Sequence, residues 1–89
     1  MPTIKVLGSG CANCQKLADS ARAAATQLGA DVQIEKVTDI ADIMSYNVLA
    51  TPGLVIDEQV VSSGRVPSVG EITTWLADAL LAAESGQNE

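Results

Sequence analysis

The first 37 residues change hydrophobic pattern twice, and this succession restricts the fold more than any other feature of the chain. Thr3–Leu7 is short and rich in β-branched side chains, which is typical of a strand. Over Cys11–Leu28 apolar side chains recur every three or four residues, and this spacing predicts a helix that ends at Gly29. Asp31–Val37 has the alternation of a second strand. Two strands joined by a helix form a parallel pair with a right-handed connection.

The middle of the chain predicts a short helix and then a β-hairpin. Asp39 can cap a helix over Ile40–Tyr46. Its large apolar side chains fall on one side of the helix: Ile40, Ile43 and Met44. Leu54–Ile56 and Gln59–Ser62 have the composition of strands. A two-residue turn can join them, although such turns favour Gly at the second position, which here is Glu58.

A final helix closes the pattern. Ser68 and Glu71 have the spacing of a capping box at its start. The apolar residues of the helix repeat on one face and are expected in the core: Ile72, Trp75, Leu76, Ala79 and Leu80. We expect one domain over residues 1–84 and a frayed polar tail over 85–89. The order β-α-β-α-β-β-α predicts an α/β fold, a four-stranded mixed sheet with helices on both faces.

The charge balance narrows the choice of partners. Eleven acidic and five basic residues give the 89-residue chain a net charge of −6. Such a chain cannot neutralise a row of phosphates, so we expect neither nucleic acid nor an anionic membrane surface as a partner.

No apolar run approaches the roughly 18 residues of a membrane span, and the first residues lack the pattern of a signal peptide. We therefore expect a cytoplasmic protein without membrane insertion.

The two cysteines of the chain, Cys11 and Cys14, are the candidate catalytic residues. They stand where a loop passes into the first predicted helix, and a helix N-terminus stabilises a thiolate through its unpaired N–H groups. In the first helical turn the first sulfur is outermost and the second is turned inward. We therefore expect Cys11 to attack a substrate disulfide and Cys14 to resolve the mixed disulfide.

Other uses of the cysteine pair are open from the residues alone. Glycine flanks Cys11 in its loop, which argues against a plain core residue. A zinc site needs about four protein ligands, whereas the chain offers two sulfurs and no histidine. A carrier of copper(I) or a metalloid, bound by both thiolates, stays as the alternative. Metallochaperones of that kind usually have Met two residues before the first cysteine, where this chain has Ser9.

A resemblance to a known family connects these features. The stretch Ile4–Leu17 reads IKVLGSGCANCQKL and resembles the active-site segment of small thioredoxin-like proteins called redox-active disulfide proteins. Three later segments match the same group: Val37–Ile40, Thr51–Asp57 and Gly64–Ser68. The resemblance covers nearly the whole chain in order. It implies a shortened thioredoxin fold with strand order 2-1-3-4, in which the first and last helices share one face and the short helix lies on the other.

The same resemblance implies further site residues. In thioredoxin-like proteins a cis-proline faces the cysteine pair. Here that residue is Pro52, and Thr51 before it offers its backbone to a substrate strand. Ala12 and Asn13, between the cysteines, are the other expected substrate-binding residues. No cofactor is expected beyond the redox-active disulfide Cys11–Cys14. The expected partners are a protein with a disulfide and a reductase that recharges the dithiol.

Three positions depart from the family pattern. Relatives often have Pro where this chain has Ala12. Lys5 falls near the position of a buried acidic residue in typical thioredoxins, and the proton relay of that residue is therefore not expected here. Ser63–Arg65 does not reproduce the turn with which glutaredoxins bind glutathione. We therefore expect protein disulfides, rather than glutathione adducts, as substrates.

Overall fold

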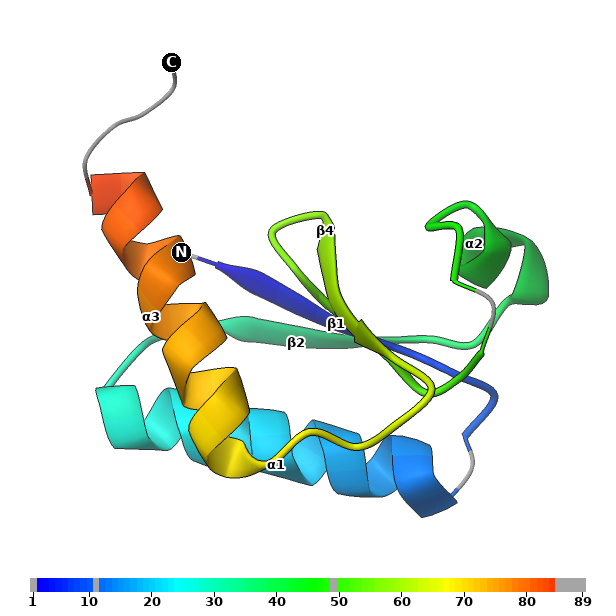
Figure 1. The fold of residues 1–89 in the computed structure, drawn as a ribbon, viewed down its shortest axis with the longest axis horizontal. Helices are drawn as coiled ribbons and strands as arrows, with labels where there is room; N and C mark the ends of the chain where they lie inside the picture. Colours follow the sequence, from blue (N-terminus) through cyan, green and yellow to red (C-terminus); the bar gives the residue numbers. More distant parts are fainter. Residues whose placement is uncertain (1, 11, 49, 85–89) are drawn as a thin grey trace.

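The computed structural model describes residues 2–10, 12–48 and 50–84 (Figure 1). Its elements follow the expected order: β1 Thr3–Leu7, α1 Ala12–Leu28, β2 Gln33–Val37, α2 Ile40–Met44, β3 Gly53–Ile56, β4 Gln59–Ser63 and α3 Val69–Glu84. The expected tail over 85–89 lies outside the described residues, and so does Cys11. Within the described part of the chain, no helix is long and apolar enough to cross a membrane.

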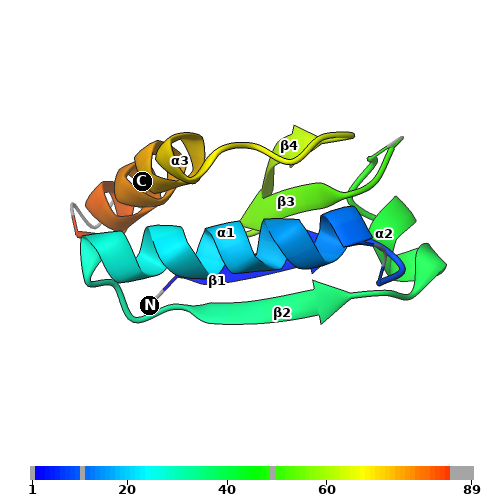
Figure 2. The ribbon, with the colours of Figure 1, turned by 90° about the horizontal axis from the view of Figure 1, so that it is seen from below.

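The four strands form one mixed sheet in the order β2-β1-β3-β4, which confirms the expected order. β1 and β2 are parallel, with Val6 opposite Lys36, as the helical crossover between them requires. β1 pairs with β3 and β3 with β4 in antiparallel fashion. The β3–β4 register shifts between Leu54 and Val55. The carboxyl ends of β1 and β2 and the start of α1 meet at one end of the molecule, on the right in Figure 2.

Helices α1 and α3 pack against each other on one face of the sheet, and α2 lies toward the other (Figures 1 and 2). Small side chains let α1 approach its neighbours closely, because its buried face is largely alanine: Ala18, Ala21, Ala24 and Ala25. Branched side chains from the strands and α3 complete this core: Ile4, Val6, Leu54, Ile56, Ile72 and Leu76. The main core is thus aliphatic.

The α2 face has a smaller core, of Leu7, Ile43 and Val55, with Tyr46 packed against it. Asp39 caps α2 as expected, since its carboxylate accepts a hydrogen bond of 2.8 Å from the Ala41 N–H. The expectation that three apolar residues of α2 face the sheet is wrong. Only Ile43 is buried, whereas two of them are mostly exposed: Ile40 at 69% and Met44 at 65%. A helix of five residues is little more than one turn and has room for one buried side chain.

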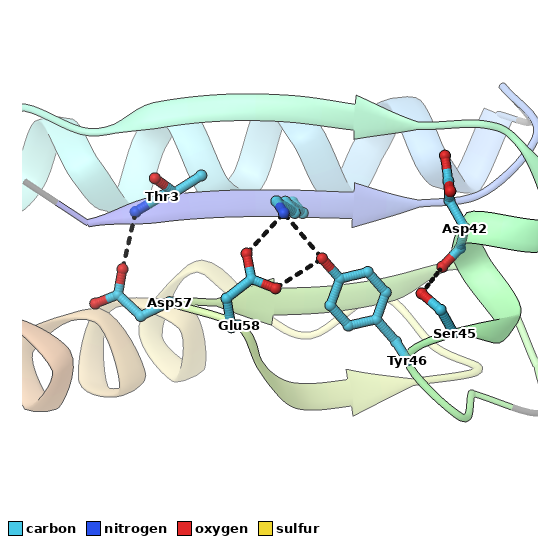
Figure 3. A network of polar contacts seen from close by, with 7 residues as sticks. Thr3, Asp42, Ser45, Tyr46, Asp57 and Glu58 are labelled. Atoms are coloured by element: carbon cyan, nitrogen blue, oxygen red, sulfur yellow. Dashed lines mark hydrogen bonds and ion pairs between the residues drawn. The ribbon is translucent and has the colours of Figure 1, made fainter.

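The β3–β4 hairpin has the tight two-residue turn that the sequence predicts. Asp57 and Glu58 have φ values of 50° and 67°, in the left-handed region that such turns require. A positive φ is unfavourable for Glu58, because this residue has a Cβ atom. Its side chain, however, forms hydrogen bonds with residues of other elements (Figure 3). The Lys5 ammonium donates to Glu58 at 2.7 Å and to the Tyr46 hydroxyl at 2.9 Å, and that hydroxyl donates to Glu58 at 2.8 Å. This network ties the turn to β1 and to the segment after α2.

Two further expectations need correction. Three of the α3 residues expected in the core are only half-buried at its edge: Trp75, Ala79 and Leu80. Trp75 and Ala79 line an open groove beside β4. β2 begins at Gln33 rather than at Asp31, because the pairing with β1 starts at Gln33. The Gln33 N–H donates to the carbonyl of Pro2 at 3.2 Å. Neither difference alters the sheet order.

Candidate active site

Cys14 lies in the first turn of α1, on the side that faces the sheet. Its side chain is 5% exposed and belongs to the main core, and its sulfur is disulfide-bonded. The expectation for the second cysteine, a buried position at a helix start, therefore matches its place in the fold. Cys11 itself lies outside the described residues, so the structure does not place the other member of the pair.

Gly8 brings the backbone after β1 directly against the Cys14 sulfur. The Gly8 N–H donates to the Val37 carbonyl at 2.9 Å, which extends the β1–β2 pairing by one residue. A Cβ atom built on Gly8 would overlap the Cys14 Sγ. Any other residue at position 8 would therefore displace the sulfur or the strand. Sequence analysis treated Gly8 only as the end of a strand, although a glycine so close to a cysteine pair is itself a sign of close backbone approach.

Thr51 and Pro52 lie beside the same glycine. The Thr51 Cβ is 3.9 Å from the position that a Gly8 Cβ would take. The Thr51–Pro52 peptide bond is cis, as the family resemblance implies. Pro52 is buried and Thr51 is exposed. The carbonyl of Pro52 accepts a 2.9 Å hydrogen bond from the Gly64 N–H, which holds the loop before α3 against this segment.

Ala12 and Asn13 form the exposed start of α1, and Cys14 follows them into the core. A partner that approaches this end of the molecule meets the helix N-terminus and the exposed Thr51. The backbone N–H groups in the first helical turn have no partner within the helix and give it a partial positive charge. The site therefore combines a thiolate-stabilising helix start with an accessible neighbouring segment.

A small cavity of about 20 Å³ lies against the Cys14 side chain. It is lined by Val6, Gly8, Gly10, Cys14, Gln15, Lys36 and Thr38. Two of these residues are joined by a hydrogen bond of 3.0 Å, which the Lys36 ammonium donates to the Gln15 Oε1. Sequence analysis did not identify either side chain as part of the site, because they come from different elements, 21 residues apart.

Lys5 and Arg65 are both engaged in ion pairs away from the cysteine. Hydrogen bonds to Glu58 and then to Tyr46 raise the pKa of Lys5. Hydrogen bonds from Lys5 and then from Tyr46 lower the pKa of Glu58. The Arg65 guanidinium makes two hydrogen bonds, of 3.1 and 3.0 Å, to the carboxylate of Glu71. That carboxylate also accepts from the Ser68 N–H, and these contacts lower the Glu71 pKa to about 2, the Arg65 bonds having the largest effect. The Lys5 ammonium lies on the α2 face of the sheet, whereas Cys14 belongs to the core on the opposite face.

The comparisons with known proteins agree with this fold. The family model for the thioredoxin domain matches residues 2–77. A thioredoxin of Methanothermobacter thermautotrophicus is 42% identical over 77 residues, 86% of this chain and 100% of the relative. A thioredoxin of Methanocaldococcus jannaschii is 39% identical over 80 residues, 90% and 92% of the two chains.

A solved structure supports the fold independently of sequence. It is that of thioredoxin-2, described as a component of malaria parasite protein secretion machinery. Its TM-score to this chain is 0.64 at 9% identity, and the match covers 88% of this chain and 82% of the other. With a family model that spans most of the sequence and two relatives matched over nearly their whole length, the chain belongs to the thioredoxin family of thiol–disulfide oxidoreductases.

Proposed function

We propose that this protein reduces or exchanges disulfide bonds in other proteins, with Cys11 as the nucleophile and Cys14 as the resolving thiol. One observation carries the proposal: Cys14 lies buried in the first turn of α1, with Gly8 and the Thr51–Pro52 segment around it. In the sequence, Cys11 directly precedes Ala12, the first residue of that helix. Such a place suits an outer, reactive thiolate.

The proposed reaction has two exchange steps. The Cys11 thiolate attacks one sulfur of the substrate disulfide, a mixed disulfide forms, and the other substrate sulfur leaves as a thiolate that takes up a proton. The Cys14 thiolate then attacks the Cys11 sulfur. The Cys11–Cys14 disulfide forms, and the second substrate thiolate is released and protonated. Two electrons pass from the protein to the substrate, and a reductase returns the Cys11–Cys14 disulfide to the dithiol.

Burial separates the roles of the two cysteines. Cys14 is nearly enclosed, and its sulfur faces Gly8 rather than solvent. A bulky protein disulfide cannot reach a sulfur in this position. The burial of Cys14 therefore supports Cys11 as the group that meets the substrate and Cys14 as the group that completes the exchange.

The substrate strand is proposed to lie along Thr51. This residue is exposed and precedes buried Pro52, so its backbone can pair with an extended peptide beside the reactive sulfur. Ala12 and Asn13 form the facing, exposed part of α1. We place the reaction in the cytoplasm, since a single close cysteine pair suits a redox role in a reducing compartment. The alternative of a copper(I) or metalloid carrier gains no support from the relatives, which are thioredoxins.

A reduction assay on a model protein disulfide tests the proposal. Insulin is incubated with dithiothreitol, and precipitation of the freed chains is followed with the wild-type protein, with Cys11→Ser and with Cys14→Ser. The wild type should accelerate precipitation over dithiothreitol alone. Both variants should lose most of this acceleration, because each lacks one of the two sulfurs that form the product disulfide. Wild-type rates in either variant would contradict the proposed dithiol mechanism.

A further inference from the structure

An open groove lies between α3 and the β3–β4 hairpin, at a place that the proposed reaction does not use. Its volume is about 250 Å³. Its lining comes from the hairpin and from α3 and includes Ile56, Val61, Trp75, Asp78 and Ala79. A second hollow of about 250 Å³ shares Ile56 and Ala79 with it and adds Asp57 at the hairpin turn. We call these two adjoining hollows the hairpin groove.

The hairpin groove lies away from the cysteine end of the sheet. β3 begins at Gly53, directly after the Thr51–Pro52 segment, and runs to Ile56 at the turn. The turn is therefore at the far end of β3, and Figure 1 shows it apart from the start of α1. β4 is the last strand of the sheet, so no strand of the described chain covers the outer side of the groove. A partner that binds there leaves Cys14 and its surroundings uncovered.

Two carboxylates of the hairpin groove lack a counter-charge. Asp78 is exposed on α3, a helix without Lys or Arg. Asp57 accepts a hydrogen bond of 3.0 Å from the Thr3 N–H, which is a neutral donor. Neither carboxylate forms an ion pair with another described residue. The groove therefore carries uncompensated negative charge.

The basic residues of the chain do not supply the missing cation. Lys5 pairs with Glu58, and Arg65 pairs with Glu71. The other three belong to α1 and β2, and none of them lines the hairpin groove: Lys16, Arg22 and Lys36. A cation in this groove must therefore come from another molecule.

Trp75 is a second feature of the groove that favours a cation. It is half-buried and stands three residues before Asp78 on α3, so both side chains lie on one face of the helix. An indole ring attracts a cation that lies over its face. A guanidinium group is planar, so it can stack on such a ring and also donate to a carboxylate. The aliphatic lining, which includes Ile56 and Val61, favours apolar side chains beside that cation.

We propose that the hairpin groove is a docking site for a partner protein, which it binds through an arginine flanked by aliphatic side chains. The guanidinium stacks on Trp75 and pairs with Asp78, and the flanking side chains contact the aliphatic lining. A second copy of this chain does not fit this description. Each copy has a net charge of −6, and both of its arginines, Arg22 and Arg65, are already ion-paired. The proposal does not depend on the roles proposed for the two cysteines.

The fluorescence of Trp75 reports directly on the groove, because the chain has one tryptophan. The full-length protein is titrated with the capped peptide Ala-Val-Arg-Val-Ala and with the same peptide containing citrulline, which keeps the shape of arginine without its charge. The arginine peptide should change the emission in a saturable way. The citrulline peptide should bind at least about threefold more weakly, and added salt should weaken only the binding of the arginine peptide.

A substitution at Asp78 tests the expected partner of the guanidinium. Asp78→Asn keeps the size of the side chain and should weaken binding of the arginine peptide about threefold, with no effect on the citrulline peptide. Asp31→Asn is the matched control, because it makes the same charge change at an exposed position before β2, outside the hairpin groove. It should leave both affinities unchanged. This readout does not use the cysteines, so its result and that of the insulin assay are independent.

Several results would overturn the proposal: no saturable change with the arginine peptide, equal binding of the two peptides, or equal weakening by Asp31→Asn and Asp78→Asn. Two other occupants are tested with the same variants. In sedimentation equilibrium, a dimer that Asp78→Asn dissociates would assign the groove to a second copy of the chain. Tighter peptide binding after removal of residues 85–89 would assign the groove to that segment. Either result would also overturn the proposal.

Discussion

The sulfur of Cys14 lies so close to the backbone of Gly8 that no Cβ atom fits between them. β1 thus ends directly against the cysteine, and the hydrogen bond from Gly8 to the Val37 carbonyl keeps this end paired with β2. The same glycine lines the small cavity next to Cys14 and lies beside Thr51. Because Gly8 has no side chain, Cys14 and Thr51 can both lie directly against the end of β1.

A substitution at Gly8 tests this relationship. Gly8→Ala should destabilise the oxidised protein by about 1–3 kcal/mol, because the added methyl group meets a sulfur held in the core. Unfolding in denaturant gives the free energy. Gly70→Ala is the matched control: Gly70 lies in α3, where an added Cβ has only an ordinary contact, at 3.9 Å from the Ser68 Oγ. That variant should gain about 0.5–1 kcal/mol. Equal effects at the two positions would show that the contact with Cys14 is unimportant.

Glu58 allows a test of backbone strain in the hairpin. Its φ of 67° is costly for any residue with a Cβ, so Glu58→Gly should be more stable than Glu58→Ala by about 1 kcal/mol. Both variants lose the bonds to Lys5 and Tyr46, so the comparison isolates the backbone. At Glu35, in the extended β2, the order should reverse and Ala should be the more stable. The same order at both positions would contradict the assigned strain. Denaturant unfolding of the four variants decides this.

The pair formed by Arg65 and Glu71 predicts how stability changes in acid. The pKa of Glu71 falls from 4.5 to about 2 in the folded protein, chiefly through its bonds to Arg65. A carboxyl group whose pKa is lowered by folding stabilises the folded state above its unfolded pKa. That contribution is lost as the pH falls from 4.5 toward 2. The thermal midpoint should therefore drop more steeply over this range in the wild type than in Glu71→Gln.

Arg65→Gln provides the control for that experiment. It leaves the carboxyl group in place but removes the main cause of its low pKa. The midpoint of this variant should therefore also fall less steeply with acid than that of the wild type. If Arg65→Gln keeps the full wild-type slope, the ion pair does not account for the acid sensitivity.

Most of the fold could be predicted because its signals are local. The apolar spacing over Cys11–Leu28 and the alternation before Val37 define a β-α-β unit, whose handedness follows from chain geometry. The capping box at Ser68 and Glu71 is present as expected, with bonds of 3.0 and 3.1 Å between the two residues. Local turn preferences do not favour Glu58 at the second position of its turn. Its side chain instead binds Lys5 and Tyr46, which are distant in the sequence, and a local pattern does not show such contacts.

The candidate site was predictable only in part. The spacing of Cys11 and Cys14 and the Thr51–Pro52 pair are visible as motifs in the sequence. The presence of Lys36 in the lining of the cavity beside Cys14 is not visible in this way, because it depends on the parallel register that sets Lys36 opposite Val6. The exposure of Ile40 and Met44 was missed for a similar reason. Periodicity defines one side of a helix but does not say how much of that side a short helix can bury.

Trapping of mixed disulfides tests the central claim most directly. The Cys14→Ser variant should accumulate covalent adducts with proteins of a cell extract, because Cys11 can attack while the resolving thiol is absent. The Cys11→Ser variant should give almost none, since its remaining cysteine, Cys14, is only 5% exposed. The adducts are seen on a non-reducing gel and should disappear after dithiothreitol.

The hypothesis of a metal carrier predicts a different result. Both substitutions would weaken ion binding to a similar extent, and neither variant would form covalent adducts. Our account predicts reductant-sensitive bands that are abundant with Cys14→Ser and nearly absent with Cys11→Ser. Bands of equal intensity in the two variants, or in neither, would contradict Cys11 as the attacking residue.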